Sequence, residues 1–295
     1  MGADQAFATG RTLATKVAAG VPGWTGEPDR PASSGRAAKA GPDAEPVLAA
    51  RGLSRQFGGL AANKDVSLDL HKGLLHAVLG PNGAGKSTLI NLLSGDLPPS
   101  GGQILYRNQD ISGWSPDRRS RAGIGRSYQR TNIFPGFTAF ENCRLAAQSR
   151  APRALRIFSR AQGYADLCDA AERALEQAGL ASRRDAIAAT LSHGEQRQLE
   201  IAMVLATSPS VLLLDEPLAG MGSEESQLMV ALLQKLSADH AILLVEHDMD
   251  AVFAVADVIT VMVTGQVLES GPPEQIRASV AVQEAYLGGG EADDE

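Results

Sequence analysis

The 295-residue chain contains little cysteine, few aromatic residues and no long uninterrupted apolar run. Its two cysteines, Cys143 and Cys168, form neither a disulfide framework nor a metal-ligand spacing, which suits a reducing cytoplasm. Aromatic residues make up only 4% of the chain and the net charge is -7, so we expect no nucleic-acid partner. Charged residues interrupt the most apolar stretch, 241–263, so the sequence predicts no membrane-spanning helix and favours a cytoplasmic location.

Composition divides the chain into three parts. About half of residues 1–46 are alanine, glycine or proline, and such a segment buries too little apolar surface to offset its ordering entropy. The last residues are strongly acidic. We therefore expect a disordered extension over 1–46, a folded domain over 47–288 and an acidic tail over 289–295.

Short apolar runs alternate with helical patterns from Val47 onward. The predicted strands are Val47–Ala50, Lys64–Leu70, Leu74–Leu79, Gln103–Tyr106, Val211–Leu214, Ala241–Val245 and Val258–Val263. The later runs are continuously apolar, as in parallel strands buried on both faces, whereas the alternating run Lys64–Leu70 indicates antiparallel pairing. Residues 142–178 have helical spacing, and Gly179 is a candidate C-cap. The sequence thus predicts an α/β fold with a mixed sheet, an antiparallel part and a helical subdomain at about 139–191.

The strongest motif follows the predicted strand Leu74–Leu79 and matches the phosphate-binding loop pattern GxxxxGK[ST]. Glycines let successive backbone N–H groups converge on phosphate oxygens, and the helix that follows adds its positive N-terminal dipole. We expect Lys86 to reach the β- and γ-phosphates of ATP and the Ser87 hydroxyl to bind Mg²⁺. The residues predicted to bind nucleotide here are Gly80, Pro81, Asn82, Gly83, Ala84, Gly85, Lys86, Ser87 and Thr88.

Two adjacent carboxylates end another predicted strand, in the run Val211-Leu-Leu-Leu-Asp-Glu-Pro217. Parallel sheets bind ligands at the carboxyl ends of their strands, so these carboxylates should lie at the phosphate site. We expect Asp215 to hold Mg²⁺ and Glu216 to polarise the attacking water.

About 20 residues before Asp215 lies Leu191-Ser-His-Gly-Glu195, in which Ser192 and Glu195 predict a capping box at the start of a helix. With the two motifs above, this run resembles the LSGGQ signature of ATP-binding-cassette (ABC) ATPases, although His193 and Glu195 replace the usual Gly and Gln. The resemblance implies a P-loop NTPase cassette in which Ser192, Gly194 and Glu195 cover the γ-phosphate bound by the opposite subunit.

The resemblance also implies roles for isolated residues. Gln129 matches the Q-loop residue that senses Mg²⁺, and His247 matches the switch histidine that contacts the γ-phosphate. Phe57 stands where the family has an aromatic residue that stacks on adenine, although an ordinary core phenylalanine remains an alternative. Gly222 stands where the family usually has the aspartate of its D-loop. This chain therefore has no side chain there to make the contact with the opposite subunit that the resemblance implies.

The resemblance covers about residues 47–287. Within the family, less specific sequence features resemble those of importers of branched-chain amino acids and amides. It implies a peripheral ATPase on the inner face of the membrane that works with transmembrane permease subunits and indirectly with a solute-binding protein. One phosphate loop and one signature in the chain imply a second ABC ATPase subunit, either a copy of itself or a paralogue. The alternatives are a urea or other solute transporter, a lipopolysaccharide-type exporter, a non-transport ABC ATPase and a cassette without turnover.

Arginines gather at 118, 119, 121, 126 and 130 and again at 144, 150, 153, 156 and 160. Two interpretations stay open for them. They face a membrane subunit or anionic lipid, or they form a solvated surface with scattered ion pairs.

Overall fold

The computed structural model describes residues 45–129, 132–150 and 162–287. The extension expected over 1–46, apart from Glu45 and Pro46, therefore lies outside the described residues, and so does the acidic tail. Within the described ranges, no helix is both long and apolar enough to cross a bilayer.

A six-stranded sheet with the order β10-β9-β3-β8-β7-β6 forms the centre of the molecule. Its strands are β3 (Leu75–Leu79), β6 (Ile124–Arg126), β7 (Val211–Asp215), β8 (Ala241–Val245), β9 (Val258–Val263) and β10 (Gln266–Gly271). Only the β10–β9 pair is antiparallel, so the sheet is mixed. Strands β3, β7 and β8 are buried along their whole length, which explains their continuous apolar runs.

A second, antiparallel sheet has the order β2-β1-β4-β5. Its strands are β1 (Leu48–Phe57), β2 (Leu60–Leu70), β4 (Gly101–Tyr106) and β5 (Gln109–Asp110). The long β1–β2 hairpin is paired from Leu48 opposite Leu70 to Phe57 opposite Leu60.

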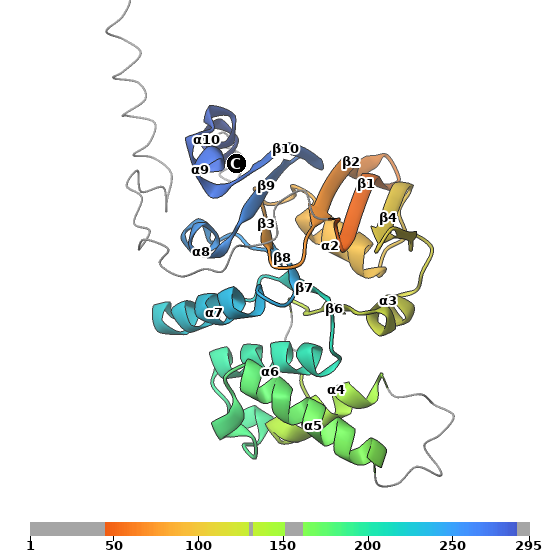
Figure 1. The fold of residues 1–295 in the computed structure, drawn as a ribbon. Coiled ribbons are helices and arrows are strands. Elements are labelled where there is room, and N and C mark those ends of the chain that lie inside the picture. The colour runs from red at the N-terminus through yellow and green to blue at the C-terminus, as the bar shows by residue number, and fades with distance from the viewer. Residues whose placement is uncertain (1–44, 130–131, 151–161, 288–295) are drawn as a thin grey trace, which may run out of the picture.

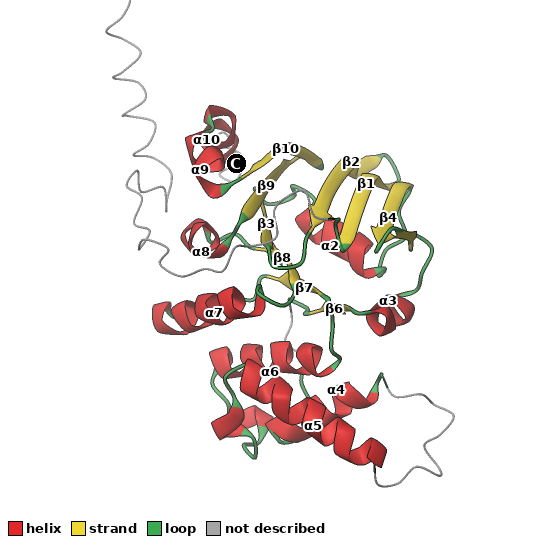
Figure 2. Cartoon of the chain, viewed as in Figure 1, coloured by secondary structure: helices red, strands yellow, loops and turns green. Residues whose placement is uncertain are grey.

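Most of the helices lie beside the two sheets, and the others form a separate group at one side (Figures 1 and 2). The α-helices are α2 (Lys86–Ser94), α3 (Pro116–Ala122), α4 (Ala139–Gln148), α5 (Gln162–Gln177), α6 (His193–Ala206), α7 (Ser223–Leu236), α8 (Met249–Val255), α9 (Pro273–Ala278) and α10 (Val280–Leu287). The described residues also include two 3₁₀ turns, η2 (Ala181–Arg183) and η3 (Ala188–Thr190). Helices α4, α5 and α6 pack against one another and form that separate group.

The central sheet separates two hydrophobic cores. Leu213 packs on the face shared with α2 and the antiparallel sheet, whereas its neighbour Leu214 packs on the face shared with α6, α7 and α8. Alternate residues of β8 divide in the same way. Helices α2 and α6 therefore belong to cores on opposite faces of the same sheet.

The predicted fold class is confirmed, and the errors lie in the shorter or more polar strands. The sequence predicts a first strand that ends at Ala50, but β1 continues to Phe57. Beyond Ala50 only Leu53 is buried, so no apolar run marks this part of the strand, and its pairing with β2 is irregular. Strands β5, β6 and β10 were not predicted. β6 has three residues, and β10 alternates exposed with half-buried positions.

The arginine cluster does not form one surface. Arg119 is 1% exposed, and its guanidinium donates to the carbonyls of Leu92 and Leu93 at the C-terminal end of α2 and to those of Ile111 and Ser112. Both interpretations of the cluster are thus wrong for Arg119, which stabilises the end of α2. Arginines 130, 153, 156 and 160 lie outside the described residues.

Candidate functional site

The loop between β3 and α2 brings its backbone close to neighbouring strands. A Cβ atom on Gly80 would lie 2.2 Å from the Met262 carbonyl oxygen, and one on Gly85 would lie 2.3 Å from that of Ala62. Both glycines have positive φ, 154° and 96° respectively. Only glycine therefore fits these two positions. Gly85 is the N-cap of α2 and provides no side-chain cap, so the first N–H groups of the helix are available to an anion.

Lys86, the first residue of α2, points back into this loop. Its Nζ donates to the carbonyl oxygens of Gly80 at 2.6 Å and Pro81 at 3.0 Å, and the residue is 8% exposed. Burial lowers the pKa of the ammonium group, while the carboxylates of Glu216 and Asp215 oppose this shift. A buried cation beside a glycine cradle and a helix N-terminus is suited to hold phosphate.

Asp215 and Glu216 stand at the carboxyl end of β7, as predicted. Asp215 is 6% exposed, and burial raises the pKa of its carboxyl group against the opposing effect of Arg126. Glu216 adopts a φ of 48°, and its N–H donates to the Val245 carbonyl at the end of β8 at 2.9 Å. The left-handed backbone turns the chain sharply out of the strand at the residue expected to act as base.

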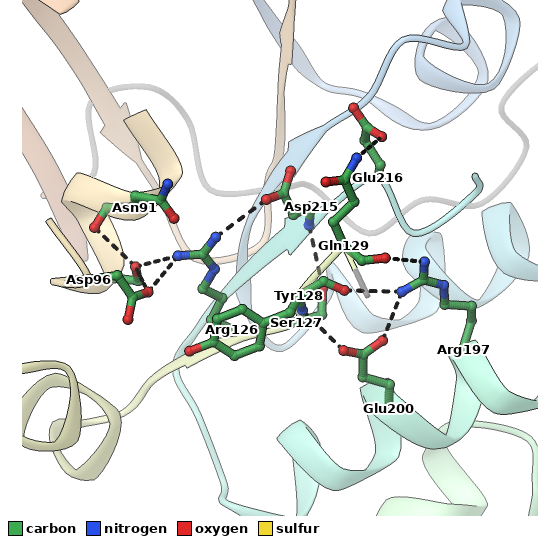
Figure 3. A network of polar contacts seen from close by, with 11 residues as sticks. Asn91, Asp96, Arg126, Ser127, Tyr128, Gln129, Arg197, Glu200, Asp215 and Glu216 are labelled. Carbon is green, nitrogen blue, oxygen red and sulfur yellow. Dashed lines mark hydrogen bonds and ion pairs between the residues drawn. The ribbon is translucent and has the colours of Figure 1, made fainter. Parts of the chain in front are cut away.

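The end of β6 and the residues that follow it contact both carboxylates (Figure 3). Arg126 forms ion pairs with Asp215 at 3.4 Å and with Asp96 at 2.6 Å. The Asp215 N–H donates to Ser127 Oγ at 3.4 Å, and the Gln129 amide nitrogen donates to Glu216 Oε2 at 3.0 Å. Gln129 therefore contacts the carboxylate expected to act as base, although its assignment from the sequence was to Mg²⁺.

His247 follows β8 on the same edge of the sheet, and its side chain is 62% exposed. The preceding residue, Glu246, is fully buried and accepts hydrogen bonds from the N–H groups of Leu218 at 2.8 Å and His247 at 3.2 Å. Burial raises the pKa of the Glu246 carboxyl group. Glu246 thus joins the turn after Glu216 to the backbone of His247.

The signature helix α6 begins at Ser192 with the predicted capping box. The Glu195 N–H donates to Ser192 Oγ at 3.2 Å, and the Ser192 N–H donates to Glu195 Oε2 at 2.9 Å. From α7, Glu225 Oε1 also accepts hydrogen bonds from the Ser192 hydroxyl at 3.0 Å and the Gly194 N–H at 3.2 Å. A Cβ on Gly194 would lie 2.8 Å from that carboxyl group. An internal carboxylate therefore occupies the anion-binding end of α6.

Two further predicted positions lie apart from the carboxylates. Phe57 is 43% exposed at the end of the β1–β2 hairpin, under the guanidinium of Arg55 at 4.7 Å, and it is not a core residue. Asn63 on β2 donates to the Gly85 carbonyl at 3.2 Å, which ties this hairpin to the phosphate loop. Gly222 is the N-cap of α7, and a Cβ there would meet no atom within 4 Å.

The oxygen donors at the site suit Mg²⁺ better than a softer metal. The Ser87 hydroxyl, the Asp215 carboxylate and the Gln129 side-chain oxygen are ligands of the kind this ion prefers. Among the described residues, no group of three His, Cys, Asp or Glu side chains could hold a metal by itself. An ion here would therefore depend on phosphate oxygens and water for its remaining ligands.

Sequence reasoning missed several charged residues that organise the site. Arg197, Glu200 and Glu246 are buried, whereas Asp96, Arg126 and Glu225 keep part of their surface exposed. Glu246 had a local signal, because a carboxylate directly after the apolar strand Ala241–Val245 requires a hydrogen-bonding partner. Arg126 and Asp215 are 89 residues apart in the chain, and no local pattern identifies such a pair.

Comparison with known proteins agrees with this geometry. Residues 63–219 match the family model described as ABC transporter, and residues 266–292 match that of the branched-chain amino acid ATP-binding cassette transporter. The high-affinity branched-chain amino acid transport ATP-binding protein LivG of Escherichia coli K12 is 39% identical, over 83% of this chain and 98% of its own. BraF of Pseudomonas aeruginosa, described in the same terms, is 38% identical over 82% and 98%.

A solved structure shares the architecture. The ADP conformation of an ATP-binding cassette of an ABC transporter superposes with a TM-score of 0.73 and 28% sequence identity. The similarity covers 83% of this chain and all of that one.

Proposed function

Because the chain belongs to the ATP-binding cassette transporter family, whose cassettes are ATPases that power transport, we propose that it energises an importer of branched-chain amino acids or related amides. The observation that carries the ATPase part is the set of contacts that brings Lys86, Asp215, Glu216 and Gln129 to one edge of the mixed sheet. The cargo rests on the C-terminal match and on the names of LivG and BraF.

In this proposal each residue has a distinct part in hydrolysis. The N–H groups at the start of α2 and the Lys86 ammonium bind the β- and γ-phosphates of ATP. Glu216 accepts the proton of the attacking water, and Gln129 holds the Glu216 carboxylate in place through its amide. His247, on the neighbouring strand end, contacts the γ-phosphate, and Phe57 stacks on adenine.

Mg²⁺ is the cofactor of the proposed reaction. Ser87, Asp215 and Gln129 would hold it, and it would neutralise charge on the β- and γ-phosphates.

We further propose that two cassettes form each complete site. Helix α2 and helix α6 pack in cores on opposite faces of the sheet, which supports binding of separate phosphates by Lys86 and Ser192. Ser192, Gly194 and Glu195 then cover the γ-phosphate bound by a second ABC ATPase subunit, either a copy of this chain or a paralogue. The domain that does this is the one we assign to residues 47–288.

The groove beside the Gln129 segment is our candidate surface for the permease. A cavity of about 340 Å³ is lined by Arg126, Tyr128 and Asn132 together with residues of α4 and α6. In the loop that follows Asn132, Phe134 and Phe137 are each almost half exposed and stack with ring centroids 5.6 Å apart. Exposed, stacked aromatic rings of this kind favour a protein partner. We assign this partner as a cytoplasmic loop of a permease subunit, which would hold the chain on the inner face of the membrane.

Reconstituted transport tests the proposal. The chain is combined in proteoliposomes with the permease subunits and solute-binding protein encoded beside it, and ATP-dependent uptake of leucine and of urea is measured. We expect leucine uptake that is lost in the Glu216→Gln variant. Uptake of urea without uptake of leucine would show that the transported solute is not a branched-chain amino acid. If the chain hydrolyses ATP without these permeases but supports no uptake when they are present, the importer assignment is wrong.

A further inference from the structure

We infer that the buried pair Arg197–Glu200 on α6 positions the backbone of Tyr128 and Gln129, so that the Gln129 side chain reaches Glu216. The pair touches neither carboxylate of the site, and its effect passes through Gln129 alone (Figure 3). This inference rests on the proposed function, because it assigns a role in ATP hydrolysis.

The contacts are made to main-chain atoms. Arg197 donates from Nη1 to the Tyr128 carbonyl at 3.0 Å and from Nη2 to the Gln129 carbonyl at 2.5 Å. Glu200 Oε1 accepts from the Tyr128 N–H at 3.1 Å, and its other oxygen pairs with Arg197 at 3.1 Å. One helix therefore holds three main-chain groups of two consecutive loop residues, which lie beyond the end of β6 and have no strand partner there.

Burial makes this arrangement specific. Arg197 is 6% exposed and Glu200 is 4% exposed. Burial raises the pKa of the Glu200 carboxyl group, while the hydrogen bonds from Tyr128 and Arg197 oppose that shift. A buried ion pair contributes little net stability compared with a well-packed apolar pair, so stability alone does not account for it. The planar guanidinium instead fixes two carbonyl groups in one geometry, which a lysine cannot do.

Gln129 is the link between this pair and the proposed chemistry. Its carbonyl oxygen accepts from Arg197 and its side-chain amide donates to Glu216, so one residue spans the gap between α6 and the end of β7. Gln129 is otherwise exposed, so no packing against neighbours holds its side chain. The position of its backbone therefore decides where the side-chain amide lies. Ser192 is the N-cap of the same helix, so a shift of the signature helix is transmitted to Tyr128 and Gln129 through these three hydrogen bonds.

The test is a double-mutant cycle in the full-length chain. Arg197→Lys keeps the charge beside Glu200 but removes the fork that holds two carbonyls. We expect ATPase kcat to fall roughly tenfold or more with little change in KM for ATP. In a Gln129→Ala background the same substitution should cost less than about twofold, because the residue it positions is gone. Arg184→Lys, which alters an exposed arginine paired with Glu172 at 2.7 Å, is the matched control and should leave kcat unchanged.

Backbone protection gives a readout independent of turnover. Amide exchange at Tyr128 should accelerate in Arg197→Lys but not in Arg184→Lys. If Arg197→Lys does not fold, Glu200→Gln provides the same cycle, with a smaller loss that again disappears in the Gln129→Ala background. Equal losses in both backgrounds, or unchanged exchange at Tyr128, would overturn the positioning role. A wild-type chain without any ATP turnover would instead refute the proposed function, whatever the exchange result.

Discussion

Glu225 on α7 and Ser192 at the N-terminus of α6 are hydrogen-bonded, with 3.0 Å between the Ser192 hydroxyl and the Glu225 carboxylate. The same carboxylate oxygen accepts from the Gly194 N–H at 3.2 Å. In the single chain, an internal anion thus occupies the end of the helix that we expect to cover the γ-phosphate of a second subunit. In the proposed dimer, closure of the two cassettes around ATP would displace this carboxylate.

Neutralising Glu225 should therefore favour the closed dimer. Glu225→Gln keeps the size of the side chain but replaces a charged acceptor with a weaker neutral one, a difference of about 1 kcal/mol. A closed dimer of this chain contains two such helix ends, so the total difference is about 2 kcal/mol. In a hydrolysis-deficient background, we therefore expect ATP-dependent dimerisation at roughly 30-fold lower protein concentration, measured by analytical ultracentrifugation.

Glu224→Gln is the control for this prediction. It removes the same charge from the same first turn of α7, but Glu224 is exposed. An equal effect of the two substitutions, or weaker dimerisation of Glu225→Gln than of the parent, would show that Glu225 does not compete with phosphate.

Removal of the proposed base should separate binding from hydrolysis. Glu216→Gln keeps the size of the side chain but cannot accept a proton, so phosphate release should fall on the order of 10²–10⁴-fold. ATP affinity, measured by calorimetry, should remain close to that of the parent because Lys86 and the α2 N-terminus are unchanged. Turnover at the parental rate would exclude Glu216 as the base.

Stability should depend on pH through His76 in β3. His76 is 6% exposed, and its ring nitrogens lie 2.7 Å from Thr260 Oγ1 and 3.1 Å from the Asp69 carbonyl. Burial lowers the pKa of His76 to about 4. The unfolded chain, with a histidine pKa near 6.5, therefore binds the proton more readily than the folded chain. The free energy of unfolding should fall by up to about 3 kcal/mol as pH drops from 6.5 to 4, and no further from this residue below pH 4.

Urea unfolding of the parent and of His76→Gln across this range measures the effect. The variant should lose less stability than the parent between pH 6.5 and 4, with their difference at pH 8 as the baseline. Parallel curves for the two proteins would show that His76 is not responsible.

The sequence could predict those parts of the site that lie together in the chain. The phosphate loop from Gly80 to Thr88, the carboxylates Asp215 and Glu216, and the capping box at Ser192 each depend on neighbouring residues, and each lies where its motif requires. The buried strands were predicted for the same reason, because a continuous apolar run is a local signal.

The rest depends on contacts between distant residues. Arg126 pairs with Asp215 across 89 positions, and Glu225 reaches Ser192 across 33. A charged residue gives no local sign of its burial, so Arg119 and Arg126 were expected to share a surface. Strand β6 is too short to produce a pattern, and it is recognised only by its pairing with β7.

Complementation between two inactive variants tests the account most directly. Ser192→Arg places a bulky cation at the N-terminus of α6 and should block closure while leaving the first ATP bound normally. Lys86→Ala should weaken ATP binding at the phosphate loop. Each protein alone should be inactive, but a mixture should regain ATPase activity, because a mixed dimer combines the intact Lys86 of one chain with the intact Ser192 of the other. No recovery in a mixture shown by crosslinking to contain mixed dimers would contradict a site shared between two cassettes.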